Sequence, residues 1–251
     1  MIIDAHVHLP VGNEYIDMES KKKRLLLEMK NAGVDKCIAI ADSWPESDIG
    51  SNSDLVDLFE DCGNVYVIGG ISPFKCFSET LENLDRFISD KKIKGIKLFT
   101  GHEEFYLTDE CIKPVYELAM KHNVPVLFHS GWDNVKYGDV NVAEEVIKEY
   151  PHLQFVCCHC WYPEISKCMG LIKYPNIAFD LSSVADNESV LDKISEEVKA
   201  LAEQVPDRVM FGSDSFGCSM EGHIKFVKGL GLAHDIEQKV LADNAIRIYG
   251  L

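Results

Sequence analysis

Two histidines separated by one residue, His6 and His8, follow a short apolar run at the start of the chain. Successive side chains of a β-strand point to opposite faces, so residues two apart share a face and both imidazoles can reach one metal ion. Pro10 and Gly12 end this strand and place the pair at its carboxyl end. The spacing alone also fits a chance pair on a half-buried strand, so its weight depends on what ends the later strands.

Further metal-binding or titratable side chains end later apolar runs, namely Lys97, His129, His159 and Asp214. Imidazole and carboxylate groups are ligands of Zn²⁺ and similar divalent ions. Such an ion lowers the pKa of bound water to about 7, and a neighbouring carboxylate can take the proton. His159 would either complete the coordination or act as a general acid and base. Any one of these residues could be a hydrogen-bonded core group, but that explanation accounts poorly for all of them at strand ends.

The elements that must position these residues alternate between apolar runs and amphipathic stretches, with a period of about 30 residues. The predicted strands are the first run through His8 and then residues 34–40, 65–71, 93–99, 124–130, 154–159, 176–182 and 208–214. The predicted helices are residues 21–32, 55–62, 81–88, 114–122, 142–150, 165–173, 194–205 and 223–251, the last with a break at residues 229–231. Alternation of this kind is typical of parallel β/α packing.

Two observations narrow the architecture. A chain of 251 residues is about the size of a minimal (β/α)₈ barrel. An open doubly wound sheet would normally carry a glycine-rich phosphate loop after a strand, and the sequence contains none. We therefore predict a single (β/α)₈ TIM-type barrel, with residues 1–251 forming one domain. In such a barrel the catalytic residues lie at the carboxyl ends of the strands.

Several motifs together resemble the amidohydrolase superfamily. They are Asp4-x-His6-x-His8, the segments 95–98, 126–131 and 211–214, His159 at the end of the sixth strand, and the closing segment 244–251. The resemblance covers essentially the whole chain and is greatest to the amidohydrolase-2 branch, which also contains metal-dependent decarboxylases. It implies that His6, His8, His129 and Asp214 bind the metal, and that His159 is either a ligand of a second ion or the acid/base. The segment His159-Cys-Trp-Tyr departs from the usual histidine, aliphatic residue and glycines, which affects one wall of the pocket.

Lys97 decides the metal count that the resemblance implies. It matches the position of the carboxylated lysine that bridges two ions in binuclear members, whereas an unmodified Lys97 could bind a substrate carboxylate as a point charge. No other feature of the sequence demands a second ion. We therefore expect one Zn²⁺ or similar divalent ion, with two ions as the alternative.

The sequence also suggests residues for the pocket mouth. Trp132 and Trp161 follow the fifth and sixth strands and are expected to contact substrate, although packing beneath a loop is an equal alternative. His102 and Glu103 follow the fourth strand and either reach the site or belong to an exposed loop. Cys157 and Cys160 form a Cys-x-x-Cys, but residues three apart on a strand face opposite ways, so we interpret both as buried structural residues.

These residues predict a hydrolase that cleaves an amide, lactone or ester bond of a small molecule with metal-activated water, Asp214 carrying the proton. A metal-dependent decarboxylase, in which His159 protonates the carbon left behind, is the main alternative. It would favour an arginine at the pocket, and no arginine directly follows a predicted strand end. A barrel that binds metal or ligand without turnover is the third hypothesis, and the complete ligand set argues against it.

Charge and cysteine content limit the partners and the compartment. The formal net charge of −16 would repel nucleic acid and anionic membranes, so a small-molecule substrate is the expected partner. The sequence shows neither a secretory signal nor an apolar run of the length a membrane helix needs. Nine scattered cysteines fit free thiols in a reducing compartment, so we expect a cytoplasmic protein. A homo-oligomer is compatible with the sequence, which does not define the oligomeric state.

Overall fold

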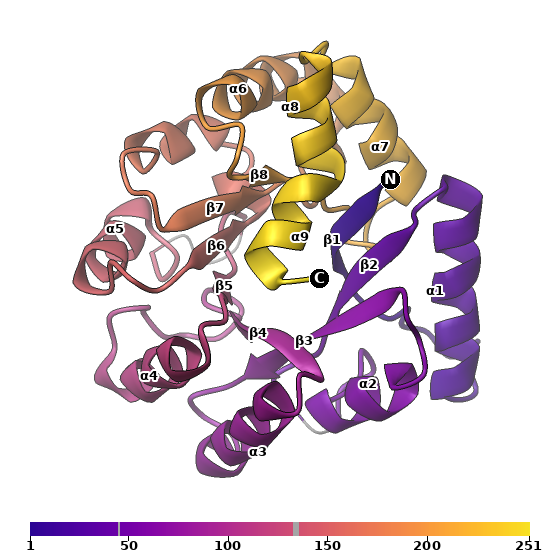
Figure 1. Cartoon of the computed structure of the whole chain (residues 1–251), viewed down its shortest axis with the longest axis vertical. Coiled ribbons are helices and arrows are strands. Elements are labelled where there is room, and N and C mark those ends of the chain that lie inside the picture. Colours follow the sequence, from indigo (N-terminus) through magenta and orange to yellow (C-terminus); the bar gives the residue numbers. More distant parts are fainter. Residues whose placement is uncertain (45, 133–135) are drawn as a thin grey trace.

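A ring of parallel strands surrounded by helices forms the centre of the protein (Figure 1). The computed structural model describes residues 1–44, 46–132 and 136–251. Within these ranges the strands are β1 (Ile3–Val7), β2 (Lys36–Ile40), β3 (Val65–Ile71), β4 (Ile93–Leu98), β5 (Val126–Phe128), β6 (Phe155–Cys158), β7 (Ile177–Asp180) and β8 (Val209–Met210). Each strand pairs in parallel with the next along the chain, in the order β1 to β8.

Backbone contacts between the last and first strands close the ring. The Ala5 amide donates to the Phe211 carbonyl over 2.9 Å, and the Asp214 amide donates to the His6 carbonyl over 2.9 Å. A parallel bridge between Val7 and Ser215 continues this pairing. The predicted (β/α)₈ barrel is therefore confirmed. β8 is shorter than the predicted segment 208–214, because its remaining residues leave regular pairing and turn towards the carboxyl end of β1.

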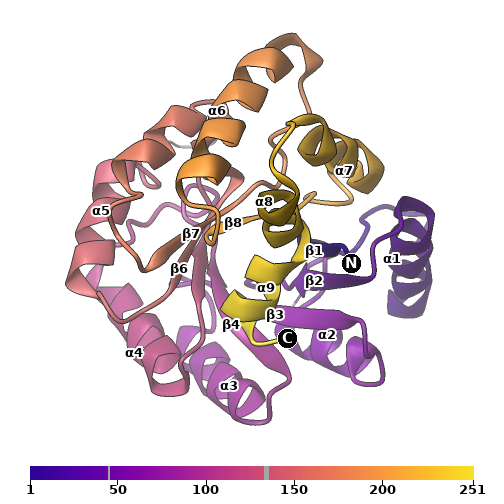
Figure 2. The same cartoon turned by 45° about the horizontal axis from the view of Figure 1, so that its top comes forward.

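The helices other than those of the C-terminal segment surround the ring of strands (Figure 2). The α-helices are α1 (Met18–Ala32), α2 (Asn52–Phe59), α3 (Phe77–Ser89), α4 (Lys113–His122), α5 (Val140–Glu149), α6 (Leu191–Gln204), α7 (Met220–Gly229), α8 (His234–Gln238) and α9 (Asn244–Tyr249). The segment Ile165–Gly170, predicted as part of a longer helix, is a short 3-10 helix.

Local sequence signals explain where several helices begin and end. Asp17 caps α1 through a capping box with Ser20, and Gly33 ends the helix with a positive φ of 74°, a conformation that glycine adopts without steric cost. α2 has a capping box of its own between Ser51 and Asp54. These signals define the ends of the helices that connect β1 to β2 and β2 to β3.

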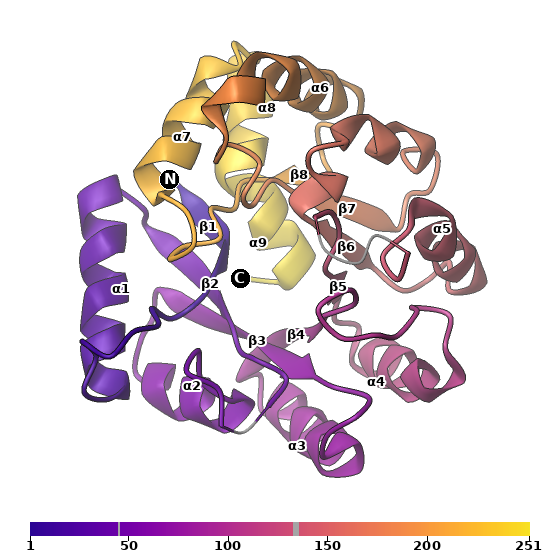
Figure 3. The same ribbon diagram turned by 180° about the vertical axis from the view of Figure 1, so that it is seen from behind.

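The C-terminal segment covers one end of the barrel. In Figure 1 the yellow ribbon of α9 lies over the middle of the strand ring, and the view from behind (Figure 3) shows the opposite end free of it. Ala245 and Tyr249 of α9 join the apolar cluster formed by inward-facing strand residues such as Ile3 and Met210. A second, larger core lies between the strands and the surrounding helices. No described helix is both long and apolar enough to span a membrane.

Candidate active site

A cavity of about 960 Å³ opens at the carboxyl ends of the strands. Five of the six residues singled out from strand ends line it, from β4 and from the segments after β1, β5, β6 and β8: His8, Lys97, His129, His159 and Asp214. His102 and Glu103, whose role the sequence left open, also line this cavity. The barrel therefore brings together residues that are up to about two hundred positions apart in the sequence.

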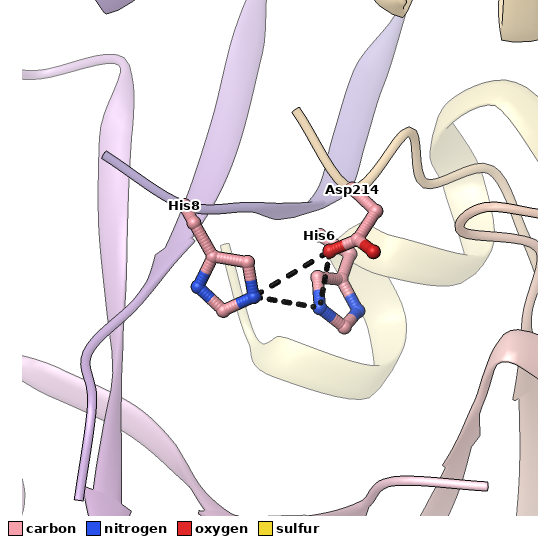
Figure 4. Close-up of side chains that lie close together, drawn as sticks. All are labelled: His6, His8 and Asp214. Carbon is pink, nitrogen blue, oxygen red and sulfur yellow. Dashed lines mark hydrogen bonds and ion pairs between the residues drawn. The ribbon is translucent and has the colours of Figure 1, made fainter. Parts of the chain in front are cut away.

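His6, His8 and Asp214 form a cluster of potential metal ligands (Figure 4). The two Nε2 atoms lie 3.3 Å apart. Asp214 Oδ1 lies 3.4 Å from His6 Nε2 and 3.5 Å from His8 Nε2. His6 lies on β1, His8 directly follows β1, and Asp214 belongs to the segment after β8 that closes the barrel, so closure itself assembles the cluster.

The other ring nitrogens of these histidines are already committed to acceptors. His6 Nδ1 lies 2.6 Å from Asp180 Oδ2, and His8 Nδ1 lies 3.1 Å from the Ile40 carbonyl. A carboxylate and a carbonyl can only accept, so each Nδ1 is the donor. The atoms left to face one another are the two Nε2 atoms and Asp214 Oδ1. A divalent cation is the partner that satisfies such a set of converging acceptors.

Burial and neighbouring groups keep this set in the form that binds metal. Burial lowers the pKa of His8 from 6.5 to about 4 and that of His159 to about 3. It also holds the pKa of His129 well below its ordinary value. Burial opposes ionisation of Asp214, but the surrounding imidazoles and the Ser183 hydroxyl outweigh it and hold its pKa well below the usual range. At neutral pH His8 and His159 are therefore neutral, and Asp214 is ionised.

Asp180 is a site residue that the sequence interpretation missed. It ends β7, is fully buried, and bonds His6 Nδ1. Burial works against its ionisation, but the adjacent His6 outweighs this and lowers the pKa of Asp180. The strand-end rule that selected Asp214 could have selected Asp180 as well, because both carboxylates end apolar runs of the barrel.

Ser182 and Ser183 connect the histidines and Asp214 to β7. The Ser182 hydroxyl lies 2.8 Å from His159 Nδ1 and 3.1 Å from His6 Nδ1. The Ser183 hydroxyl donates to Asp214 Oδ2 over 2.5 Å. Ser182 therefore restrains the imidazole rings of His6 and His159, and Ser183 restrains the carboxylate of Asp214.

His129 and His159 lie next to the cluster rather than inside it. The ring centroid of His159 lies 5.0 Å from that of His6 and 4.8 Å from that of His129. His129 Nε2 is buried and has no hydrogen-bond partner among the described residues. An unpartnered buried imidazole nitrogen at a cavity wall is an available ligand or substrate contact.

Lys97 is 1% exposed, and its side chain lines the cavity. No carboxylate in the described ranges forms an ion pair with it, and its Nζ lies 5.5 Å from the centroid of the Phe99 ring. A buried ammonium without a carboxylate partner is costly, so a bound anion or a chemical modification of the amine would stabilise it.

The two tryptophans expected at the pocket mouth have different positions. Trp132 is 42% exposed, lines the cavity, and lies 5.4 Å from the ring of His159. Trp161 is 1% exposed, does not line the cavity, and donates from Nε1 to the Gly138 carbonyl over 2.7 Å. His159, Cys160 and Trp161 all have positive φ angles, and this left-handed turn directs the indole of Trp161 into the core. The expectation that Trp161 contacts substrate is corrected accordingly.

Arg24 reaches the cavity from α1, although no strand end precedes it. Its guanidinium packs 5.4 Å from the centroid of the Phe216 ring and pairs with Glu28 over 3.0 Å. Searching only the residues after strands therefore overlooked an arginine at the site.

Cys157 and Cys160 are fully buried, as the structural interpretation of this Cys-x-x-Cys requires. Cys157 lies 3.2 Å from the Ser130 hydroxyl, whereas Cys160 donates to the Asp180 carbonyl over 3.2 Å. The two thiols thus serve different neighbours.

An eight-stranded parallel barrel with histidines and an aspartate at the carboxyl ends of its strands is the architecture of metal-dependent β/α-barrel enzymes. A family model described as Amidohydrolase matches residues 3–251, and the chain belongs to this family. The resemblance seen in the sequence motifs is thereby confirmed. The chain is a metal-dependent enzyme of this family, and both hydrolysis and decarboxylation are compatible with it.

Solved structures share the fold at low sequence identity. An uncharacterised TIM-barrel protein from Bordetella bronchiseptica is 17% identical, with a TM-score of 0.80 over 99% of this chain and 98% of that chain. A 5-carboxyvanillate decarboxylase from Novosphingobium aromaticivorans, complexed with manganese and a nitrobenzoic acid, is 16% identical, with a TM-score of 0.67 over 91% and 80%. A dihydroorotase from Campylobacter jejuni is 18% identical, with a TM-score of 0.70 over 100% and 83%. No curated protein matches the sequence.

Proposed function

We propose that this protein is a hydrolase that cleaves an amide, lactone or ester bond of a small molecule with one Zn²⁺ ion held by His6, His8 and Asp214. The observation that carries the proposal is the convergence of His6 Nε2, His8 Nε2 and Asp214 Oδ1 within 3.5 Å, with each Nδ1 committed elsewhere. In this proposal residues 1–251 act as one catalytic domain. The unpaired thiols of the described cysteines favour the cytoplasm as its compartment.

The residues around the cluster have distinct roles in this proposal. When bound, a divalent ion lowers the pKa of water and polarises a carbonyl oxygen. Asp214 is ionised, so its carboxylate can accept a proton from water in the cavity and return it to the leaving group. Ser183 holds Oδ2 of that carboxylate, which leaves Oδ1 towards the histidines. His129 supplies a further lone pair at Nε2, and neutral His159 can accept a proton.

Two cationic side chains of the cavity support a small anionic substrate in this proposal, although the acidic Glu14, Asp42 and Glu103 line the same cavity. Lys97 and Arg24 bring positive charge to its wall, and Trp132 supplies an exposed aromatic face at its mouth. An ammonium and a guanidinium both bind carboxylate oxygens, the guanidinium through two parallel hydrogen bonds where geometry allows. We propose that Lys97 is unmodified and contacts a substrate carboxylate, with a carboxylated Lys97 bridging two ions as the alternative.

A decarboxylase is the second candidate, and one specific observation favours it. Arg24 lines the cavity, so the pocket contains the arginine that a decarboxylase would use to bind a substrate carboxylate. In that reaction His159 would have to deliver a proton to carbon. His159 is neutral at rest, so it would first need to gain that proton.

Product analysis separates the two candidates. The metal-loaded protein is tested against panels of amides, lactones, esters and aromatic or aliphatic carboxylic acids, and both acid release and carbon dioxide are measured. The proposal predicts a new carboxylic acid without carbon dioxide, and loss of turnover in Asp214→Asn. Carbon dioxide release, lost in a His159→Gln variant, would replace hydrolysis by decarboxylation.

A further inference from the structure

A second group of potential ligands lies apart from the cavity. Asp186, Cys218 and His223 place one ligand atom each within 4.8 Å of one another. Asp186 follows β7, Cys218 follows β8, and His223 lies on α7. None of the three lines the cavity of the active site. We call this group the Cys218 cluster.

His223 is oriented as a metal ligand would be, because a hydrogen bond from its Nδ1 leaves Nε2 as the ligand atom. Its side chain is 3% exposed, and its Nδ1 lies 3.0 Å from the Ser219 carbonyl. A carbonyl only accepts, so Nδ1 carries the proton and Nε2 carries the lone pair. Nε2 lies 3.7 Å from Asp186 Oδ1, and its contact from the Ala185 amide is long at 3.3 Å.

Cys218 and Asp186 provide the sulfur and the oxygen. Cys218 Sγ lies 2.6 Å from Asp186 Oδ2, with the thiol proton between them. The Asp186 side chain is 37% exposed, so an ion can approach this pair from solvent. Thiolate, imidazole and carboxylate together form a ligand set that suits Zn²⁺ or Co²⁺ and leaves a fourth position for water.

A short path of hydrogen bonds joins the Cys218 cluster to the active site. Cys218 Sγ lies 3.2 Å from the Ser183 hydroxyl, and that hydroxyl donates to Asp214 Oδ2. The Cys218 thiolate, with any ion bound to it, would therefore lie two contacts away from the carboxylate that completes the His6 and His8 cluster, counted from the sulfur.

We propose that Asp186, Cys218 and His223 form a second binding site for a divalent transition-metal ion, separate from the site at His6, His8 and Asp214. Binding displaces the thiol proton of Cys218 to solvent and replaces it with the ion. Through Ser183 the occupied site restrains the orientation of Asp214. This proposal does not depend on the reaction that the enzyme catalyses.

Cobalt distinguishes the two sites because the Cys218 cluster contains a sulfur ligand and the set of His6, His8 and Asp214 does not; the buried Cys158, which lies within 4.8 Å of ligand atoms of His6 and Asp180, is unaffected by the Cys218→Ser substitution. We would titrate the full-length apoprotein with Co²⁺ and record the near-ultraviolet thiolate-to-cobalt charge-transfer absorption. The expected result is a band that saturates at one thiolate-bound ion per chain and is lost in Cys218→Ser. Cys111→Ser, an exposed cysteine elsewhere, and His8→Ala should both retain the band.

Further variants keep the test informative if Cys218→Ser folds poorly. Asp186→Asn changes one atom of a half-exposed side chain, and loss of a direct ligand should weaken cobalt binding by more than about tenfold. Absence of the charge-transfer band in the wild type, or its persistence in Cys218→Ser, would overturn the proposal. If the charge-transfer band is present but no cobalt binds at His6 and His8, the proposal for the Cys218 cluster stands and only the active-site assignment is contradicted.

Discussion

His6 Nδ1 and Asp180 Oδ2 lie 2.6 Å apart at the base of the active site, and both side chains are fully buried. Asp180 ends β7 and His6 lies on β1, so this contact crosses the interior of the barrel. It fixes the tautomer of His6 and aims Nε2 at His8 and Asp214. Loss of a hydrogen-bond partner of this kind typically lowers metal affinity by about 10- to 100-fold.

Asp180→Asn tests that relationship. The amide oxygen can still accept the Nδ1 hydrogen bond, but the negative charge beside His6 is lost. We expect metal affinity to fall by about 10- to 100-fold, measured by competition with a coloured chelator. Asp235→Asn, at an exposed position of α8, is the matched control and should not change the affinity. Equal affinity in Asp180→Asn and wild type would show that Asp180 does not act on the site.

Stability of the metal-free protein should depend on pH because of the buried histidines. Burial lowers the pKa of His8 from 6.5 to about 4 and that of His159 to about 3. As the pH falls, the unfolded chain therefore binds these two protons at a higher pH than the folded chain does. The contribution of these two neutral histidines to the free energy of unfolding is complete above pH 6.5 and is lost as the pH falls towards 4. Burial raises the pKa of Asp4 to about 7, which offsets part of this effect in the opposite direction.

Urea denaturation of the metal-free protein at pH 7 and pH 4.5 would measure this dependence. We expect the free energy of unfolding to fall on acidification by an amount on the order of a few kcal/mol. His8→Gln lacks one of the titrating groups and should show a smaller pH dependence than the wild type. An unchanged difference between the two pH values in His8→Gln would exclude His8 as a source of the effect.

The different positions of the two tryptophans predict different consequences of mutation. Trp161→Phe removes the Nε1 donor to the Gly138 carbonyl and part of a buried ring, so it should destabilise the protein by about 1–3 kcal/mol. Trp132→Ala removes an exposed ring at the cavity and should raise KM with little loss of stability. Thermal unfolding and steady-state kinetics on both variants would check this. If Trp161→Phe is as stable as the wild type and has a raised KM, Trp161 contacts substrate after all.

Arg24→Gln should weaken binding of anionic substrates or inhibitors. The guanidinium lines the cavity from α1, and a hydrogen bond to a charged group contributes about 1.5–3 kcal/mol, which corresponds to roughly a 10- to 100-fold change in affinity. Arg86→Gln, on the exposed side of α3, is the matched control. If isothermal titration with small carboxylates gives equal affinities for wild type and Arg24→Gln, Arg24 does not bind the substrate.

Much of this fold was predictable because a barrel has a simple sequence pattern. Buried parallel strands are continuous apolar runs, and their carboxyl ends must meet, so His6, His8 and Asp214 could be grouped before the structure was known. Arg24 could not be assigned to the site from the sequence, because its long side chain reaches the cavity from a helix and no strand-end signal marks it. Trp161 could not be placed either, because the left-handed turn at residues 159–161 has no signature such as glycine.

The measurement that tests the central claim most directly is the metal content of chains prepared in a Cys218→Ser background, which excludes the proposed thiolate site. We predict close to one divalent ion per chain, retained in Lys97→Ala and lost in His8→Ala or Asp214→Ala. Nearly two ions per chain, falling in Lys97→Ala, would instead make Lys97 a bridge between two metals. One ion per chain that persists in both His8→Ala and Asp214→Ala would contradict the assignment of the metal to His6, His8 and Asp214.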